Sequence, residues 1–179
     1  MDISTLVKVT SRAWSLNILA SMHAGTPGRQ ALLLSASGAG RTAFGQSLGH
    51  LVDLGLLERN PGHGHPLRPE YRLTQTGAEV ARIADKIKQA ARQPDERVLV
   101  RRSWTIPVLV VSQEPRYFTD IKAALGSITD RALSQSLMKL QAQHWLRREI
   151  DLDIRPARPR YQAANVGAQI SQAVGLDSL

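Results

Sequence analysis

The chain has 179 residues and no cysteine, which excludes disulfides, thiolate catalysis and zinc–thiolate sites. No apolar run approaches the roughly 18 residues that span a membrane, and no secretory signal pattern begins the chain, so we expect a cytoplasmic protein without a membrane partner. The net charge is +8, and it is divided evenly: residues 1–98 hold 12 basic and 8 acidic side chains, and the remainder hold 11 and 7. An even basic excess favours a polyanionic partner.

The first predicted elements form a helix-turn-helix. Helical spacing of apolar residues begins at Leu6 and runs to Ala20, which predicts one helix that ends at the Gly/Pro-rich residues 25–28. A short helix over residues 29–35, a glycine turn over 37–40 and a third helix over 41–54 follow. Helix, glycine turn and helix in this order are typical of DNA-binding proteins.

The third helix has one apolar stripe and one polar face. We expect Phe44, Leu48, Leu51 and Val52 to be buried. The residues then predicted to face outward and read base edges are Arg41, Thr42, Gln46 and His50.

A β-hairpin wing is predicted after this helix. Gly55 ends the helix, residues 56–59 and 71–74 have strand character, and a Gly/His/Pro-rich tip lies between them. The candidates for contact with the DNA backbone or minor groove in this half of the chain are Arg29, His63, His65, Arg68 and Arg72.

A longer helix follows the wing. Thr76 and Glu79 suggest a capping box, and Val80, Ile83, Ile87 and Ala91 form an apolar stripe on a helix that reaches about Arg92. Residues 93–97 then suggest a linker. The predicted domains are therefore 1–92 and 98–179, joined by 93–97.

The second domain repeats the first. Trp14, Pro69, Tyr71 and Gly77 recur ninety residues later as Trp104, Pro159, Tyr161 and Gly167, with a slip of one residue between these anchors. We expect helices over 103–112 and 117–124, a turn over 125–128, and a further helix capped by Thr129. Pro107 is then tolerated because it lies in a first turn.

The second recognition helix carries different outward residues. Leu133, Leu137 and Leu140 form its buried stripe, and its predicted base readers are Arg131, Ser134, Gln135 and Lys139. The backbone or wing candidates in this half are Arg116, Lys122, Arg155, Arg158 and Arg160.

The fold class predicted is mainly α with small β wings: two tandem winged helix-turn-helix domains in one chain. The apolar stripe on the helix ending near Arg92 is not needed to close the core of the first module. We expect it to pack against the C-terminal helix that carries Val166, Ile170 and Val174. This predicts an intramolecular pseudo-dimer, with a homodimer as the alternative. Because the outward residues of the two copies differ, the two DNA half-sites should be unequal.

The motif order resembles that of the HxlR-type winged helix-turn-helix regulators within the broader MarR-like group. The resemblance rests on Trp14, the helix-turn-helix, the segments 54–59 and 69–74, and Gly77, and it is repeated around Trp104, 116–121, 125–129 and 133–137. The second copy lacks the Leu73–Thr74–x–x–Gly77 pattern. Such regulators are typically single modules that dimerise on DNA, so the resemblance implies a nucleoid-associated transcription factor.

Two other functions compete with DNA regulation. Winged-helix pairs also serve as protein-interaction scaffolds, as in segregation and condensation proteins, and as replication initiators. Catalysis has little support, because the His63/His65 and Asp151/Asp153 pairs are more simply wing residues and no phosphate-binding glycine loop is present. We expect no enzyme activity, no cofactor and no metal.

Overall fold

The computed structural model describes residues 1–60 and 69–175. Two compact units make up the chain, residues 9–89 and residues 1–8 together with 90–179. The elements of the first copy are α1 (Ile3–Thr10), α2 (Ser15–His23), α3 (Gln30–Ser37), α4 (Arg41–Asp53), β1 (Leu57–Arg59), β2 (Tyr71–Leu73) and α5 (Gln75–Ala90).

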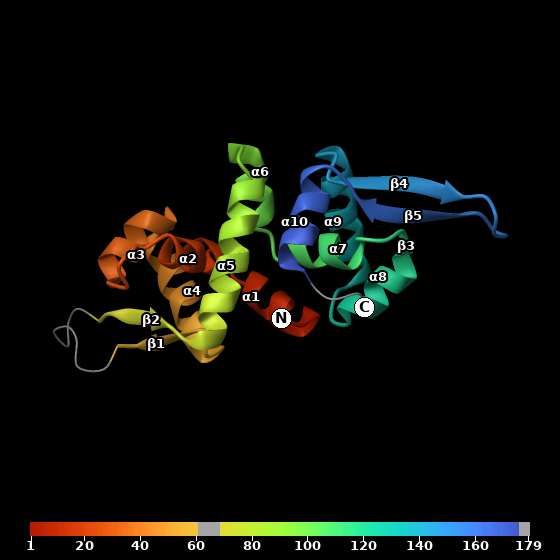
Figure 1. Cartoon of the computed structure of the whole chain (residues 1–179). Helices are drawn as coiled ribbons and strands as arrows, with labels where there is room; N and C mark the ends of the chain where they lie inside the picture. Colours follow the sequence, from red (N-terminus) through yellow and green to blue (C-terminus); the bar gives the residue numbers. More distant parts are fainter. Residues whose placement is uncertain (61–68, 176–179) are drawn as a thin grey trace. The chain divides into compact units, whose positions relative to one another are not determined.

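The second copy repeats this order of elements (Figure 1). Its elements are α6 (Pro94–Val100), α7 (Thr105–Val111), β3 (Arg116–Tyr117), α8 (Phe118–Leu125), α9 (Asp130–Ala142), β4 (Leu146–Asp151), β5 (Arg158–Ala163) and α10 (Val166–Val174). The described chain is mainly helical with small antiparallel sheets, as the sequence predicts.

The wings differ in width. In the first copy, β1 and β2 form a two-stranded antiparallel sheet, and a single bridge between Arg29 and Glu70 lies beside it. In the second copy, this bridge is extended into β3, which gives the order β3-β5-β4. The β4–β5 hairpin extends away from the helices of its own unit (Figure 1).

The recurring glycines have a packing reason. A Cβ on Gly77 would collide with the backbone carbonyl of Leu56, and one on Gly167 would collide with that of Trp145. The same carbonyl of Leu56 accepts a hydrogen bond from the Thr74 amide at 3.1 Å, and that of Trp145 accepts one from Ala164 at 2.9 Å. Each glycine therefore lets the helix after the wing lie directly on the chain that enters the wing.

Several local predictions are wrong at the ends of helices. The first helix is broken at residues 11–14 into α1 and α2, with Ala13 exposed. Thr74 rather than Thr76 caps α5, because its hydroxyl accepts the Gly77 amide at 3.0 Å. Four of the five residues interpreted as a linker begin α6, where the Gln93 amide donates to Glu96 Oε2 at 2.8 Å.

The last helix of the second copy packs within its own unit. α10 packs on α7 within the same unit, and Ile170 and Val174 are buried. The apolar stripe of α10 thus has a partner in its own module. Pro107 lies in the first turn of α7, as expected, although Trp104 and not Ser103 precedes that helix.

Candidate nucleic-acid interface

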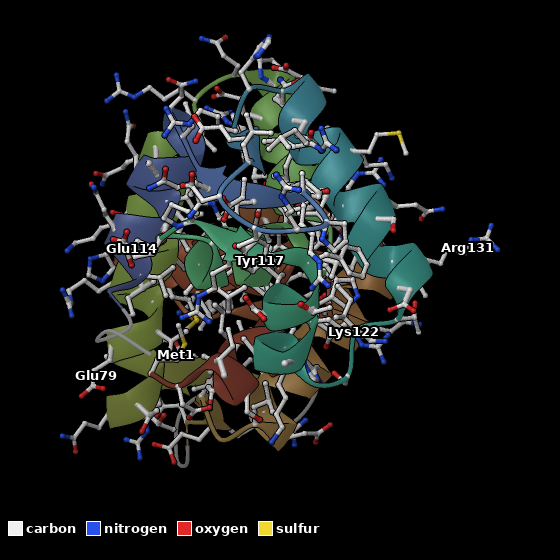
Figure 2. The ribbon with its side chains drawn as sticks, turned by 90° about the vertical axis from the view of Figure 1, so that its right-hand side faces the viewer. Met1, Glu79, Glu114, Tyr117, Lys122 and Arg131 are labelled. Atoms are coloured by element: carbon white, nitrogen blue, oxygen red, sulfur yellow. The ribbon has the colours of Figure 1, made fainter. Side chains whose placement is uncertain are left out.

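The helix-turn-helix of the second copy is formed by α8 and α9. Gly126 ends α8 with a positive φ of 65°, and Thr129 caps α9 by accepting the Ala132 amide at 3.2 Å, as predicted. Lys122 Nζ on α8 lies 2.6 Å from Asp130 Oδ1 on α9, so this predicted phosphate contact already has an ion-pair partner. Figure 2 shows Arg131 extending outward from the beginning of α9, with Lys122 on the neighbouring helix.

The structure places the four predicted base readers of α9 on its exposed side. Leu133, Leu137 and Leu140 are buried on the opposite side, as expected. The exposed residues are Arg131, Ser134, Gln135 and Lys139. The sequence interpretation missed Met138, a large apolar side chain that is 63% exposed on the same helix.

The corresponding face of α4 has fewer and shorter side chains. Arg41, Thr42 and Gln46 are exposed, but His50 is half-buried and its Nε2 lies 3.3 Å from the Ser11 hydroxyl. A Cβ built on Gly45 or Gly49 would meet no atom within 4 Å. The exposed side of α4 therefore combines short polar side chains with two positions that have no side chain at all.

The buried stripe of α4 differs from the prediction at one position. Phe44, Leu48 and Leu51 are buried, whereas Val52 is 36% exposed and Ser47 takes its place in the core. The buried stripe includes position 47 and not position 52, because residues 44, 47, 48 and 51 follow the i, i+3, i+4, i+7 pattern and residues 44, 48, 51 and 52 do not.

In the first wing, the cations of the strands are partly paired. Arg72 Nε lies 2.8 Å from Glu58 Oε1 on the opposite strand, and both side chains are exposed. Arg29 is exposed directly before α3. His63, His65 and Arg68 lie outside the described residues.

In the second wing, Arg155 and Arg158 are exposed. Arg160 forms an ion pair with the buried carboxylate of Asp151. Asp151 is only 4% exposed, and its Oδ2 lies 3.4 Å from Arg160 Nε. The Tyr117 hydroxyl donates to the same oxygen at 2.5 Å, and the Asp153 amide donates to Oδ1 at 3.1 Å. A buried aspartate is stable only with such partners.

This cluster shifts the pKa values of the Asp151 carboxyl and the Tyr117 phenol. The hydrogen bond from Tyr117 holds the pKa of Asp151 below its ordinary value, and the Asp153 amide and the Arg160 charge act in the same direction against the effect of desolvation. The same bond raises the pKa of the Tyr117 phenol. The cluster joins the loop end of β4 to β3, immediately before α8, where Arg116 is half-buried.

In residues 1–60 and 69–175, no three His, Asp or Glu side chains gather in a way that could hold a metal ion. Within the same residues, no helix has the length and apolar character needed to cross a bilayer. The Asp151 carboxylate accepts a hydrogen bond from the Asp153 backbone amide, so these two residues are joined through the backbone and not as a pair of carboxylates.

Fold and exposed surface together define a tandem winged helix-turn-helix protein. The family model described as HxlR-like helix-turn-helix matches twice, over residues 9–97 and 99–176. The chain therefore belongs to the HxlR-like helix-turn-helix family as a tandem duplication, and it is a DNA-binding transcriptional regulator. Families of this kind are typically non-enzymatic. Comparison with curated proteins and with solved structures gives no significant match.

Proposed function

We propose that this protein is a sequence-specific regulator that binds double-stranded DNA through α4 and α9 as two non-identical recognition helices. One observation carries the proposal: equivalent helices in the two copies each expose a polar face, and these faces differ. Arg41, Thr42 and Gln46 are exposed on α4, whereas Arg131, Gln135 and Lys139 are exposed on α9. Arginine and glutamine make bidentate contacts with guanine and adenine in the major groove.

The remaining exposed cations suit the phosphate backbone. We assign Arg29, Arg155 and Arg158 to contacts that position the protein without reading sequence. Lys122, Arg72 and Arg160 have intramolecular partners, so they would have to exchange an ion pair for a phosphate contact. The basic excess of each half supports a polyanionic partner.

Both modules, 1–92 and 98–179, are proposed to act on one DNA molecule inside the cytoplasm, at the nucleoid. Dimeric helix-turn-helix proteins present two recognition helices to half-sites about 34 Å apart, and linkage in one chain raises the effective concentration of the second module. An intramolecular pair then reads two unequal half-sites, whereas a homodimer of this chain would favour a palindrome.

Selection of bound sites from random duplex DNA tests this proposal, together with gel-shift titrations across a salt series. We expect an asymmetric consensus and a steep loss of affinity as salt rises, because phosphate neutralisation releases counterions. A strictly palindromic consensus would refute the assignment of one half-site to each copy. Lack of binding at low salt would favour a protein-interaction scaffold, and repeated sites at a replication origin would favour an initiator.

A further inference from the structure

The exposed side of α9 has a definite central line. Arg131, Gln135 and Met138 are separated by four and three residues, so their side chains follow one another along the helix. This line lies opposite the buried residues Leu133, Leu137 and Leu140, while Ser134 and Lys139 lie on its two flanks. A helix in the major groove turns its central line toward the bases and its flanks toward the sugar–phosphate walls.

Met138 is the apolar member of this line. Its neighbours one turn away are Ser134, Gln135, Gln141 and Ala142, none of which is acidic. The acidic residue of α9, Asp130, lies at the far end of the helix and is paired with Lys122. The thioether chain is 63% exposed, and none of these neighbouring positions on α9 holds a carboxylate. Burial of this chain against an apolar group of a partner is favourable.

We propose that Met138 is a specificity-determining residue that packs against the 5-methyl group of a thymine in the half-site read by the second copy. The thymine methyl is the apolar group on the major-groove edges of the base pairs, and apolar side chains contact it. This inference rests on the proposed function and adds the base that one residue selects. The expected order along the half-site is a guanine at Arg131, an adenine at Gln135 and a thymine at Met138.

The first copy lacks this contact. Its equivalent central line is Thr42, Gln46 and Gly49, each 89 residues earlier in the chain. A Cβ on Gly49 would meet no atom within 4 Å, so the helix has room there for a side chain. The first half-site should therefore have no methyl preference at the corresponding position, and Gly49→Met offers a way to create one.

The test uses the full chain and the DNA site obtained by selection. Each thymine of the second half-site is replaced in turn by deoxyuridine, which removes only the methyl group. For the wild-type protein, we expect one replacement to weaken binding about threefold to tenfold. Met138→Ala should bind thymine and uracil duplexes equally, and Gly49→Met should acquire methyl sensitivity in the first half-site. Leu152→Ala, which removes an exposed apolar side chain from the second wing, is the matched control and should keep the wild-type sensitivity.

The outcomes separate the inference from the function on which it rests. If wild type and Met138→Ala bind the selected DNA with the same ratio of thymine to uracil affinity, the role of Met138 is refuted while DNA reading stands. If no variant binds duplex DNA at low salt, the proposed function fails and the inference falls with it. If sedimentation shows that Met138→Ala dissociates an oligomer of the wild-type chain, Met138 contacts protein instead of a base.

Discussion

Gly77 is a position at which a single added methyl group should destabilise the first copy. The Cβ of an alanine there would overlap the carbonyl oxygen of Leu56 and lie 2.8 Å from its carbonyl carbon. Backbone atoms cannot rotate away, and this carbonyl also accepts hydrogen bonds from the Thr74 amide at 3.1 Å and the Thr74 hydroxyl at 3.3 Å. Relief of the overlap must therefore move α5 away from the chain that enters the wing.

The expected size of the effect follows from two opposing terms. Overpacking costs about 1–3 kcal/mol, and contact with backbone favours the upper end of that range. Alanine gains about 1 kcal/mol over glycine inside a helix. We therefore expect Gly77→Ala to lower the free energy of unfolding of the first copy by about 2 kcal/mol.

Gly49→Ala is the matched control. Gly49 lies inside α4, and a Cβ there has nothing within 4 Å. Only the propensity term remains, so this variant should be more stable than the wild type by roughly 0.5–1 kcal/mol. Urea unfolding followed by circular dichroism measures both variants, and hydrogen exchange of the Thr74 and Ala78 amides locates the effect. Equal midpoint shifts in the two variants, or a Gly77→Ala midpoint at or above that of the wild type, would refute the packing argument.

Three further predictions concern the second copy. Because the folded-state pKa of Asp151 is lowered, its stabilising contribution is present above the unfolded pKa and is lost as pH falls through the lower folded value, below about pH 4. Because the pKa of Tyr117 is raised, its contribution is present below the unfolded pKa and is lost as pH rises through the folded value, above about pH 10. Thermal unfolding across pH should show both losses in the wild type and a weaker acid dependence in Asp151→Asn; identical profiles would contradict the role of the carboxylate. Thr129→Ala should cost about 0.5–2 kcal/mol, since it removes the N-cap of α9, while Thr129→Ser should retain most of the stability in the same melts. In binding titrations, Gln135→Ala should relax base preference at one position by roughly 1–3 kcal/mol, whereas Arg158→Ala should weaken all sequences alike and reduce the salt slope; equal, sequence-independent losses from both would contradict the division between reading and positioning.

Local sequence patterns determined the order of the elements and which side of each recognition helix is buried. Leu133, Leu137 and Leu140 are buried as their helical spacing predicts, and Thr129 caps α9 as its side-chain chemistry predicts. These features depend on residues within a few positions of one another. The capping pair Gln93–Glu96 was also present locally, so α6 was within reach of the same reasoning although a linker was predicted there.

The tertiary structure decided the pairings between distant residues. Tyr117 and Asp151 are 34 residues apart, and they meet because β5 lies between β3 and β4 in the sheet. The contact of His50 with Ser11 and the packing of α10 on α7 likewise depend on how elements fold back on one another. The periodic pattern predicts which side chains are buried or require a polar partner, because this depends on the polarity of each side chain. The pattern does not predict which distant residue each side chain contacts, because strand register and helix packing determine the distances between segments far apart in the chain.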